Sequence, residues 1–68
     1  MLIGSGMTAR SVNIGPRTAY TVHSEDGTEL ATVYYDPRFG YVLQADGDAV
    51  FSADGLRGLA QFVAERGG

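Results

Sequence analysis

Runs of alternating apolar and polar residues follow one another along the chain and are separated by turn residues. Residues 11–14 alternate, with Val12 and Ile14 apolar, and this short run ends at Gly15-Pro16. Runs rich in β-branched and aromatic residues then follow at 17–24, 29–35, 41–45 and 49–52. The pattern predicts an antiparallel meander of four strands, or of five if the N-terminal run joins the sheet.

Three turn signals separate these runs. Asp26-Gly27 between two strand-like runs is the strongest short-range hairpin signal. In the loop 36–40, proline pre-sets the backbone and Gly40 can adopt a positive φ. Asp46-Gly47-Asp48 is the third turn, so the expected connectivity is a simple meander.

The C-terminal part follows a helical period instead. Leu56, Leu59, Ala60 and Val63 recur at i, i+3, i+4 and i+7, and Phe62 flanks this stripe. Ser52 is placed to cap the helix, and the glycines at 67 and 68 end it. The chain is therefore expected to have an α+β fold, in which one C-terminal amphipathic helix packs on one face of the sheet.

The 68 residues suffice for one small domain, and there is no cysteine to staple it. We expect that domain to span residues 10–68. Residues 1–9 are expected to form a flexible segment, because 4–6 read Gly-Ser-Gly and Met7 would serve as a natural start. No apolar run approaches the roughly 20 residues of a membrane span, so no membrane partner is expected.

Period-two alternation divides the predicted sheet into two faces. With a two-residue turn at Asp26-Gly27, one face is almost entirely apolar, and the helix should cover it. That face carries Tyr20, Val22, Ala31, Val33, Tyr35, Tyr41, Leu43 and Val50.

The opposite face should be polar if it meets water, yet it also carries large apolar side chains. Its expected interface residues are Leu30, Tyr34, Val42, Phe51 and His23. One helix cannot cover both faces, so a second copy or another protein is expected on this patch. Alternatively, the N-terminal segment with Ile3, Val12 and Ile14 folds across it.

Two loop lengths stay open at this point. A three-residue loop at 46–48 would turn Phe51 into the core and Val50 out of it. A four-residue loop at 37–40 would exchange Leu43 for Val42 on the covered face.

Charge and chemistry add little. The net charge is −3, which disfavours a phosphate-backbone binder. A single-stranded nucleic-acid binder that stacks bases on Tyr34 and Phe51 is the alternative function. His23 is the only histidine and has no second histidine or cysteine to work with, so no catalytic residue is expected. Asp46-Gly47-Asp48 lacks the further oxygen ligands of a calcium loop, so neither a metal nor a cofactor is expected.

All five basic residues are arginines and there is no lysine, a bias typical of a high-GC bacterium or its phage. Residues 51–60, Phe-Ser-Ala-Asp-Gly-Leu-Arg-Gly-Leu-Ala, resemble the C-terminal end of short actinobacterial and actinophage proteins in which a β-meander precedes a capped helix. The match covers the C-terminal quarter, and the chain departs from that pattern at Gly55 and Gly58. The resemblance implies this fold class and no transferable active site. The expected protein is a non-enzymatic, homodimeric interaction module in the cytoplasm of a bacterial cell or phage-infected host.

Overall fold

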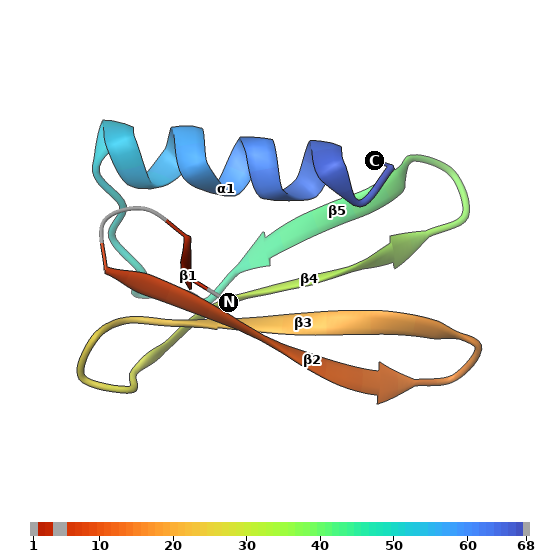
Figure 1. Cartoon of the computed structure of the whole chain (residues 1–68), viewed down its shortest axis with the longest axis horizontal. Helices are drawn as coiled ribbons and strands as arrows, with labels where there is room; N and C mark the ends of the chain where they lie inside the picture. The colour runs from red at the N-terminus through yellow and green to blue at the C-terminus, as the bar shows by residue number, and fades with distance from the viewer. Residues whose placement is uncertain (1, 4–5, 68) are drawn as a thin grey trace.

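One antiparallel sheet with a helix across one of its faces makes up the fold of the computed structural model, which describes residues 2–3 and 6–67 (Figure 1). The strands pair in chain order, β1-β2-β3-β4-β5. The elements are β1 (Leu2–Ile3), β2 (Met7–Ile14), β3 (Arg17–His23), β4 (Glu29–Asp36), β5 (Gly40–Ala45) and α1 (Ala53–Glu65). The predicted α+β class, the antiparallel meander and the C-terminal helix are confirmed.

The hairpins form where the turn residues predict them. Gly15, with φ of 66°, and Pro16 connect β2 to β3, so that Ile14 lies opposite Arg17. Between β4 and β5, Asp36 lies opposite Gly40, which has φ of 82°. Positive φ values of this kind strain any residue with a Cβ atom, which is why glycine occupies both positions.

The register confirms the predicted division into two faces. Tyr20 lies opposite Val33, and Tyr35 lies opposite Tyr41, as predicted. Because Leu43 pairs with Val33, it lies on the covered face, and its neighbour Val42 lies on the open face. This excludes the four-residue alternative for the loop at 37–40.

The prediction of a two-residue turn at Asp26-Gly27 was wrong, however. Gly27 N donates to Ser24 O (3.0 Å) and Ser24 N donates to Thr28 O (2.9 Å), which makes the loop three residues long. A register shift between Val22 and His23 compensates for the extra residue and restores the predicted pairs.

The core lies between the sheet and α1. Val22 and Val33 are fully buried, and the helix contributes Leu59 and Phe62. The ring of Phe62 packs edge-on against Tyr20 with the ring centroids 5.2 Å apart. The buried cluster consists of Ile3, Met7, Ala9, Val22, Ala31, Val33, Leu59 and Phe62.

The N-terminal residues differ from the expectation of a flexible segment at 1–9. Met7 and Ala9 begin β2 and are each only 4% exposed, and Ile3 is buried as well. Residues 7–10 alternate apolar and polar, so Met7 and Ala9 extend the core face of β2. Ile3 therefore packs in the core, and Val12 lies within the sheet rather than across it. Residues 1, 4 and 5 lie outside the described part of the chain.

The prediction of a strand at 49–52 was wrong. The backbone N–H of Asp46 still donates to Leu30 O (2.9 Å), but the N–H of Ala49 then closes a turn onto Asp46 O (3.1 Å). Beyond this turn the chain leaves the sheet, because it must bring Ser52 to the start of a helix that lies over the covered face. Val50 is consequently 86% exposed, whereas Phe51 packs against the core.

The helix begins as predicted but presents a different side to the sheet. The Ser52 hydroxyl oxygen accepts from Gly55 N (3.0 Å), which is the expected N-cap. The buried residues of α1 are Gly55, Leu59 and Phe62. Leu56, predicted to be in the buried stripe, is 54% exposed. Ala60 is exposed too, so the apolar stripe extends beyond the contact with the sheet.

Candidate protein-interaction surfaces

Four apolar residues form one row across the face of the sheet that the helix does not cover. Val12 lies opposite Ala19, and Tyr34 lies opposite Val42. Continuing the β3–β4 register places Ala19 beside Tyr34, and Ala19 is only 4% exposed. We call Val12, Ala19, Tyr34 and Val42 the open-face patch.

The row beside the open-face patch is polar. It contains Arg10, Thr21, Thr32 and Gln44, which pair in the same register. This face therefore has the mixed character of a sheet surface that meets water.

The residues predicted for the interface do not all come together. Tyr34 and Val42 are cross-strand neighbours in the open-face patch. His23 lies on the same side of the sheet at its opposite end, where it pairs with Thr8 and, through an irregularity in register, with Glu29. Leu30 and Phe51 instead pack against the core cluster. The patch is thus narrower than the sequence predicts.

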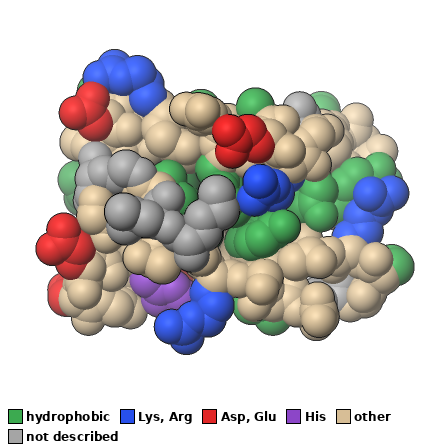
Figure 2. Space-filling view, in the orientation of Figure 1, with side chains coloured by type: hydrophobic (Ala, Val, Ile, Leu, Met, Phe, Trp, Pro, Cys, Tyr) green, Lys and Arg blue, Asp and Glu red, His purple; other side chains and the backbone are tan. Residues whose placement is uncertain are grey.

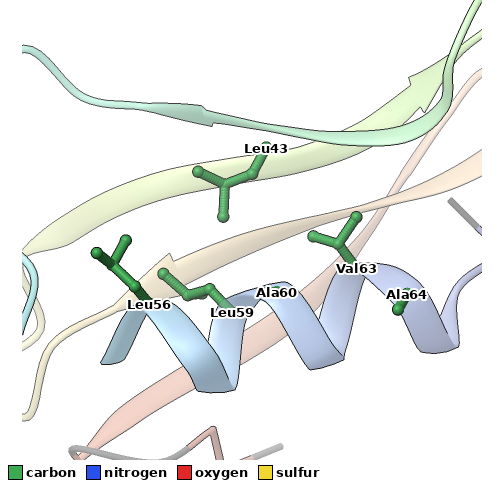
Figure 3. Close-up of a pocket in the computed structure, with 6 residues that line it drawn as sticks. All are labelled: Leu43, Leu56, Leu59, Ala60, Val63 and Ala64. Atoms are coloured by element: carbon green, nitrogen blue, oxygen red, sulfur yellow. The ribbon is translucent and has the colours of Figure 1, made fainter. Parts of the chain in front are cut away.

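A second apolar surface lies between α1 and β5, and the sequence analysis missed it. It is a groove with a volume of about 450 Å³. Figure 3 shows Leu43 pointing from β5 toward the helix, with Leu56 and Val63 beside it. The side chains that line it are all apolar: Leu43, Leu56, Leu59, Ala60, Val63 and Ala64. We call this surface the α1–β5 groove.

The floor and the rim of the α1–β5 groove differ in exposure. Leu59 at the floor is 3% exposed, whereas Leu56 at the rim is 54% exposed. Ala60 and Ala64 on the rim are exposed as well and leave room beside the helix. The groove is therefore an extension of the core that reaches the surface.

The acidic residues of α1 lie away from this groove. Asp54 pairs with Arg57 (2.5 Å), and Gln61 donates to Glu65 (3.3 Å). At about 100° per residue, Asp54, Gln61 and Glu65 project from a different side of the helix than Leu56 and Ala60. Arg57 is the charged residue of α1 that lies nearest the rim, about 20° round the helix from Ala64, and the lining of the groove carries no charge.

The signal for this groove was present in the width of the helical stripe. An α-helix that covers a sheet needs an apolar arc of roughly 100°. The residues from Phe62 round to Ala64 span about 200° at the helical period. A stripe of this width cannot be buried on one flat face, so part of it must remain exposed.

Acidic residues at two hairpins have local partners. Asp26 accepts hydrogen bonds from the Ser24 hydroxyl and from Thr28 N, and these lower its pKa from 3.8 to about 2. The pKa of Asp36 is also lowered, because Arg38 donates to it from its backbone N–H (2.7 Å) and from its side chain. Both carboxylates therefore stabilise turns.

Residues 2–3 and 6–67 contain no group of three or more His, Asp or Glu side chains that could hold a metal ion. None of the helical residues described forms a segment of the length and apolarity needed to cross a membrane. On the face shown in Figure 2, the arginines are separated from one another rather than gathered into a basic patch.

Searches against protein-family models, curated proteins and solved structures found no match to this chain. The resemblance to short actinobacterial and phage proteins therefore stays a prediction.

Proposed function

We propose that this chain is a non-enzymatic protein-interaction module that associates with a second copy of itself. The observation that carries this proposal is the α1–β5 groove, which exposes a continuous apolar surface next to the core. Contact between such a surface and water is unfavourable, and association with another protein surface removes it.

The α1–β5 groove supports this role better than the open-face patch does. The patch is a single apolar row beside a row of threonines, arginine and glutamine, and Ala19 within it is already buried. The groove combines an exposed leucine at its rim with an uncharged lining. Interface centres are typically depleted of charge, as the groove is.

The placement of aromatic and basic residues favours a protein partner over a single-stranded nucleic acid. Tyr34 lies on the open face, whereas Phe51 packs against the core, so the two rings offer no common stacking surface. Arg17 stacks on Tyr35 at 3.8 Å from the ring centroid, and Arg66 lies 4.5 Å from that of Phe62. These two guanidinium groups already have partners within the chain.

Sedimentation equilibrium over a range of concentrations tests the proposal. We expect the mass to rise from 7.2 kDa toward twice that value, and Leu56→Gln to weaken the association at least tenfold. Val50→Gln is the matched control, because Val50 is an exposed apolar residue outside the groove. A constant monomer mass up to about 1 mM, or equal effects of the two substitutions, contradicts the proposal.

A further inference from the structure

Strand β5 forms one edge of the sheet, and nothing in its sequence protects that edge. Within residues 2–3 and 6–67, β5 pairs only with β4, in a regular register from Asp36–Gly40 to Ala31–Ala45. Exposed edge strands in natural proteins usually carry a charge, a proline or a bulge that blocks pairing with another chain. The six residues Gly-Tyr-Val-Leu-Gln-Ala contain none of these.

The opposite side of the sheet is different. There, β1 pairs with the first residues of β2, at Met7 and Thr8. The uncovered remainder of β2 carries Arg10 and ends at Gly15-Pro16. The β5 edge is therefore the better template for another strand.

The hydrogen-bond pattern identifies the backbone groups that β5 presents outward. Asp46 N donates to Leu30 O, which sets the phase of the β4–β5 ladder. Residues 40, 42 and 44 accordingly exchange hydrogen bonds with β4. The N–H and C=O groups of Tyr41, Leu43 and Ala45 point away from the sheet. Tyr41 and Leu43 also have their side chains on the helix side, next to the groove.

We propose, building on the homodimeric function above, that β5 pairs antiparallel with β5 of a second copy. A two-fold axis makes any strand antiparallel to its own copy, so Tyr41, Leu43 and Ala45 can exchange hydrogen bonds with the same residues across the axis. The two sheets then become one continuous sheet. The two α1 helices lie side by side on it and close both grooves.

The helix surface is complementary to itself in this arrangement. In an antiparallel pair of helices centred near Ala60, Leu56 of one copy lies across from Ala64 of the other. A large side chain thus meets a small one on both sides of the axis. The long apolar leucine enters the space that the alanine leaves, which fills the α1–β5 groove.

Electrostatic repulsion between two copies is smallest at an edge without acidic residues. Each copy carries a net charge of −3, so two copies repel unless their acidic residues stay apart. Neither β5 nor the lining of the groove contains an acidic residue. This is therefore a side on which two copies can meet without a like-charge contact at the centre of the interface.

Amide hydrogen exchange measured by NMR on the unmodified chain tests the pairing directly. We expect the amides of Tyr41, Leu43 and Ala45 to become at least tenfold more protected as the protein concentration rises through the dimerisation range. Ser11 is the internal control, since its N–H faces away from β3 on the other edge. Unprotected β5 amides in a sample that sediments as a dimer would overturn the pairing.

A pair of proline variants separates this inference from the proposed function. Ala45→Pro removes an outward N–H of β5, and Ser11→Pro removes an equivalent outward N–H of β2. Neither group bonds within the sheet, so both variants should keep the far-ultraviolet circular dichroism of a folded chain. We expect Ala45→Pro to weaken the dimer at least tenfold and Ser11→Pro to leave it unchanged.

Other results with these variants would locate the dimer contact elsewhere. A dimer that survives Ala45→Pro but dissociates in Leu56→Gln overturns the strand pairing and leaves the proposed function in place. A dimer that dissociates only in Ser11→Pro places the contact at β2 and overturns the inference. A chain that remains monomeric but binds an added extended peptide along β5 shows a foreign strand in place of the second copy, which also overturns it.

Discussion

The two sides of β5 expose apolar residues in different ways. On the open face, Val42 belongs to the narrow open-face patch with Tyr34, and the row of side chains beside this patch is polar. On the helix side, Leu43 belongs to a groove that continues into the core at Leu59. The comparison shows that, in a sheet covered by one helix, the solvent-exposed apolar surface can lie along the side of the helix rather than on the uncovered face of the sheet.

Leu59→Ala should have the largest effect, because Leu59 lies both in the core and at the floor of the α1–β5 groove. We expect the free energy of unfolding to fall by about 3 kcal/mol, as is usual for a buried leucine. Leu56→Ala at the rim should cost less than about 1 kcal/mol in the monomer, because its side chain is already half in water. Urea denaturation at low protein concentration measures both; equal losses would show that the rim is part of the core.

Ser52→Ala should cause the next largest loss of stability. It should destabilise the start of α1, beside the α1–β5 groove, more than the open face of the sheet. The Ser52 hydroxyl accepts from Gly55 N at the start of α1, and loss of such a cap costs about 1 kcal/mol. The first helical turn carries Leu56, so its amide exchange should accelerate more than that of Val42 on the open face. Uniform acceleration at both sites would mean that the cap stabilises the whole fold and not the helix start.

Tyr34→Asp tests the open face. Loss of the cross-strand contact between Tyr34 and Val42 should lower the free energy of unfolding by about 0.5–1 kcal/mol. Because Tyr34 lies on β4, one strand in from the proposed β5–β5 contact, the dimerisation constant from sedimentation should change less than threefold. Complete dissociation by this variant would move the interface to the open face.

The smallest effect on stability is expected at the β3–β4 turn, which connects two strands that contribute to both faces of the sheet. Asp26 has its pKa lowered to about 2, first by the Ser24 hydroxyl, from an ordinary value of 3.8. A lowered pKa contributes stability above pH 4, and that contribution is lost as the pH falls toward 2. Ser24→Ala should raise the pKa of Asp26 and weaken this acid dependence, as an NMR titration of the carboxyl group would measure. An unchanged pKa would contradict the role of Ser24.

The register of the central strands could be predicted because turn chemistry and alternation agree there. The loop 36–40 has the predicted length, and the pairs between β4 and β5 confirm the faces that it defines. Between β3 and β4 the predicted pairs form as well, but only because a register shift between Val22 and His23 compensates for a loop that is one residue longer than predicted. The Ser52 cap was predictable for the same reason, since a local hydrogen bond defines it. Sequence patterns are sufficient to predict an element when its structure depends only on residues close to it in the chain.

The errors arose where the path of the chain depends on distant contacts. Residues 49–52 alternate like a strand, yet the helix must start over the covered face, so this segment becomes a crossover. Likewise, Ala9 lies opposite Val22 of β3 and Met7 lies opposite Ile3 of β1, and both are buried in the core cluster, which also contains residues of α1. The rotation of α1 buries Gly55, Leu59 and Phe62 and exposes Leu56; it depends on tertiary packing such as that of Phe62 on Tyr20 and could not be derived from the period alone.

The most direct test is an isotope-filtered NOE experiment on a mixture of labelled and unlabelled chains. Val12 lies on the open face of β2, whereas Leu43 lies on the helix side of β5, so their methyl groups report on the two surfaces separately. The account predicts intermolecular NOEs from the methyl groups of Leu43 and Leu56 and none from those of Val12. Intermolecular NOEs from Val12 without any from Leu43 and Leu56 would contradict it.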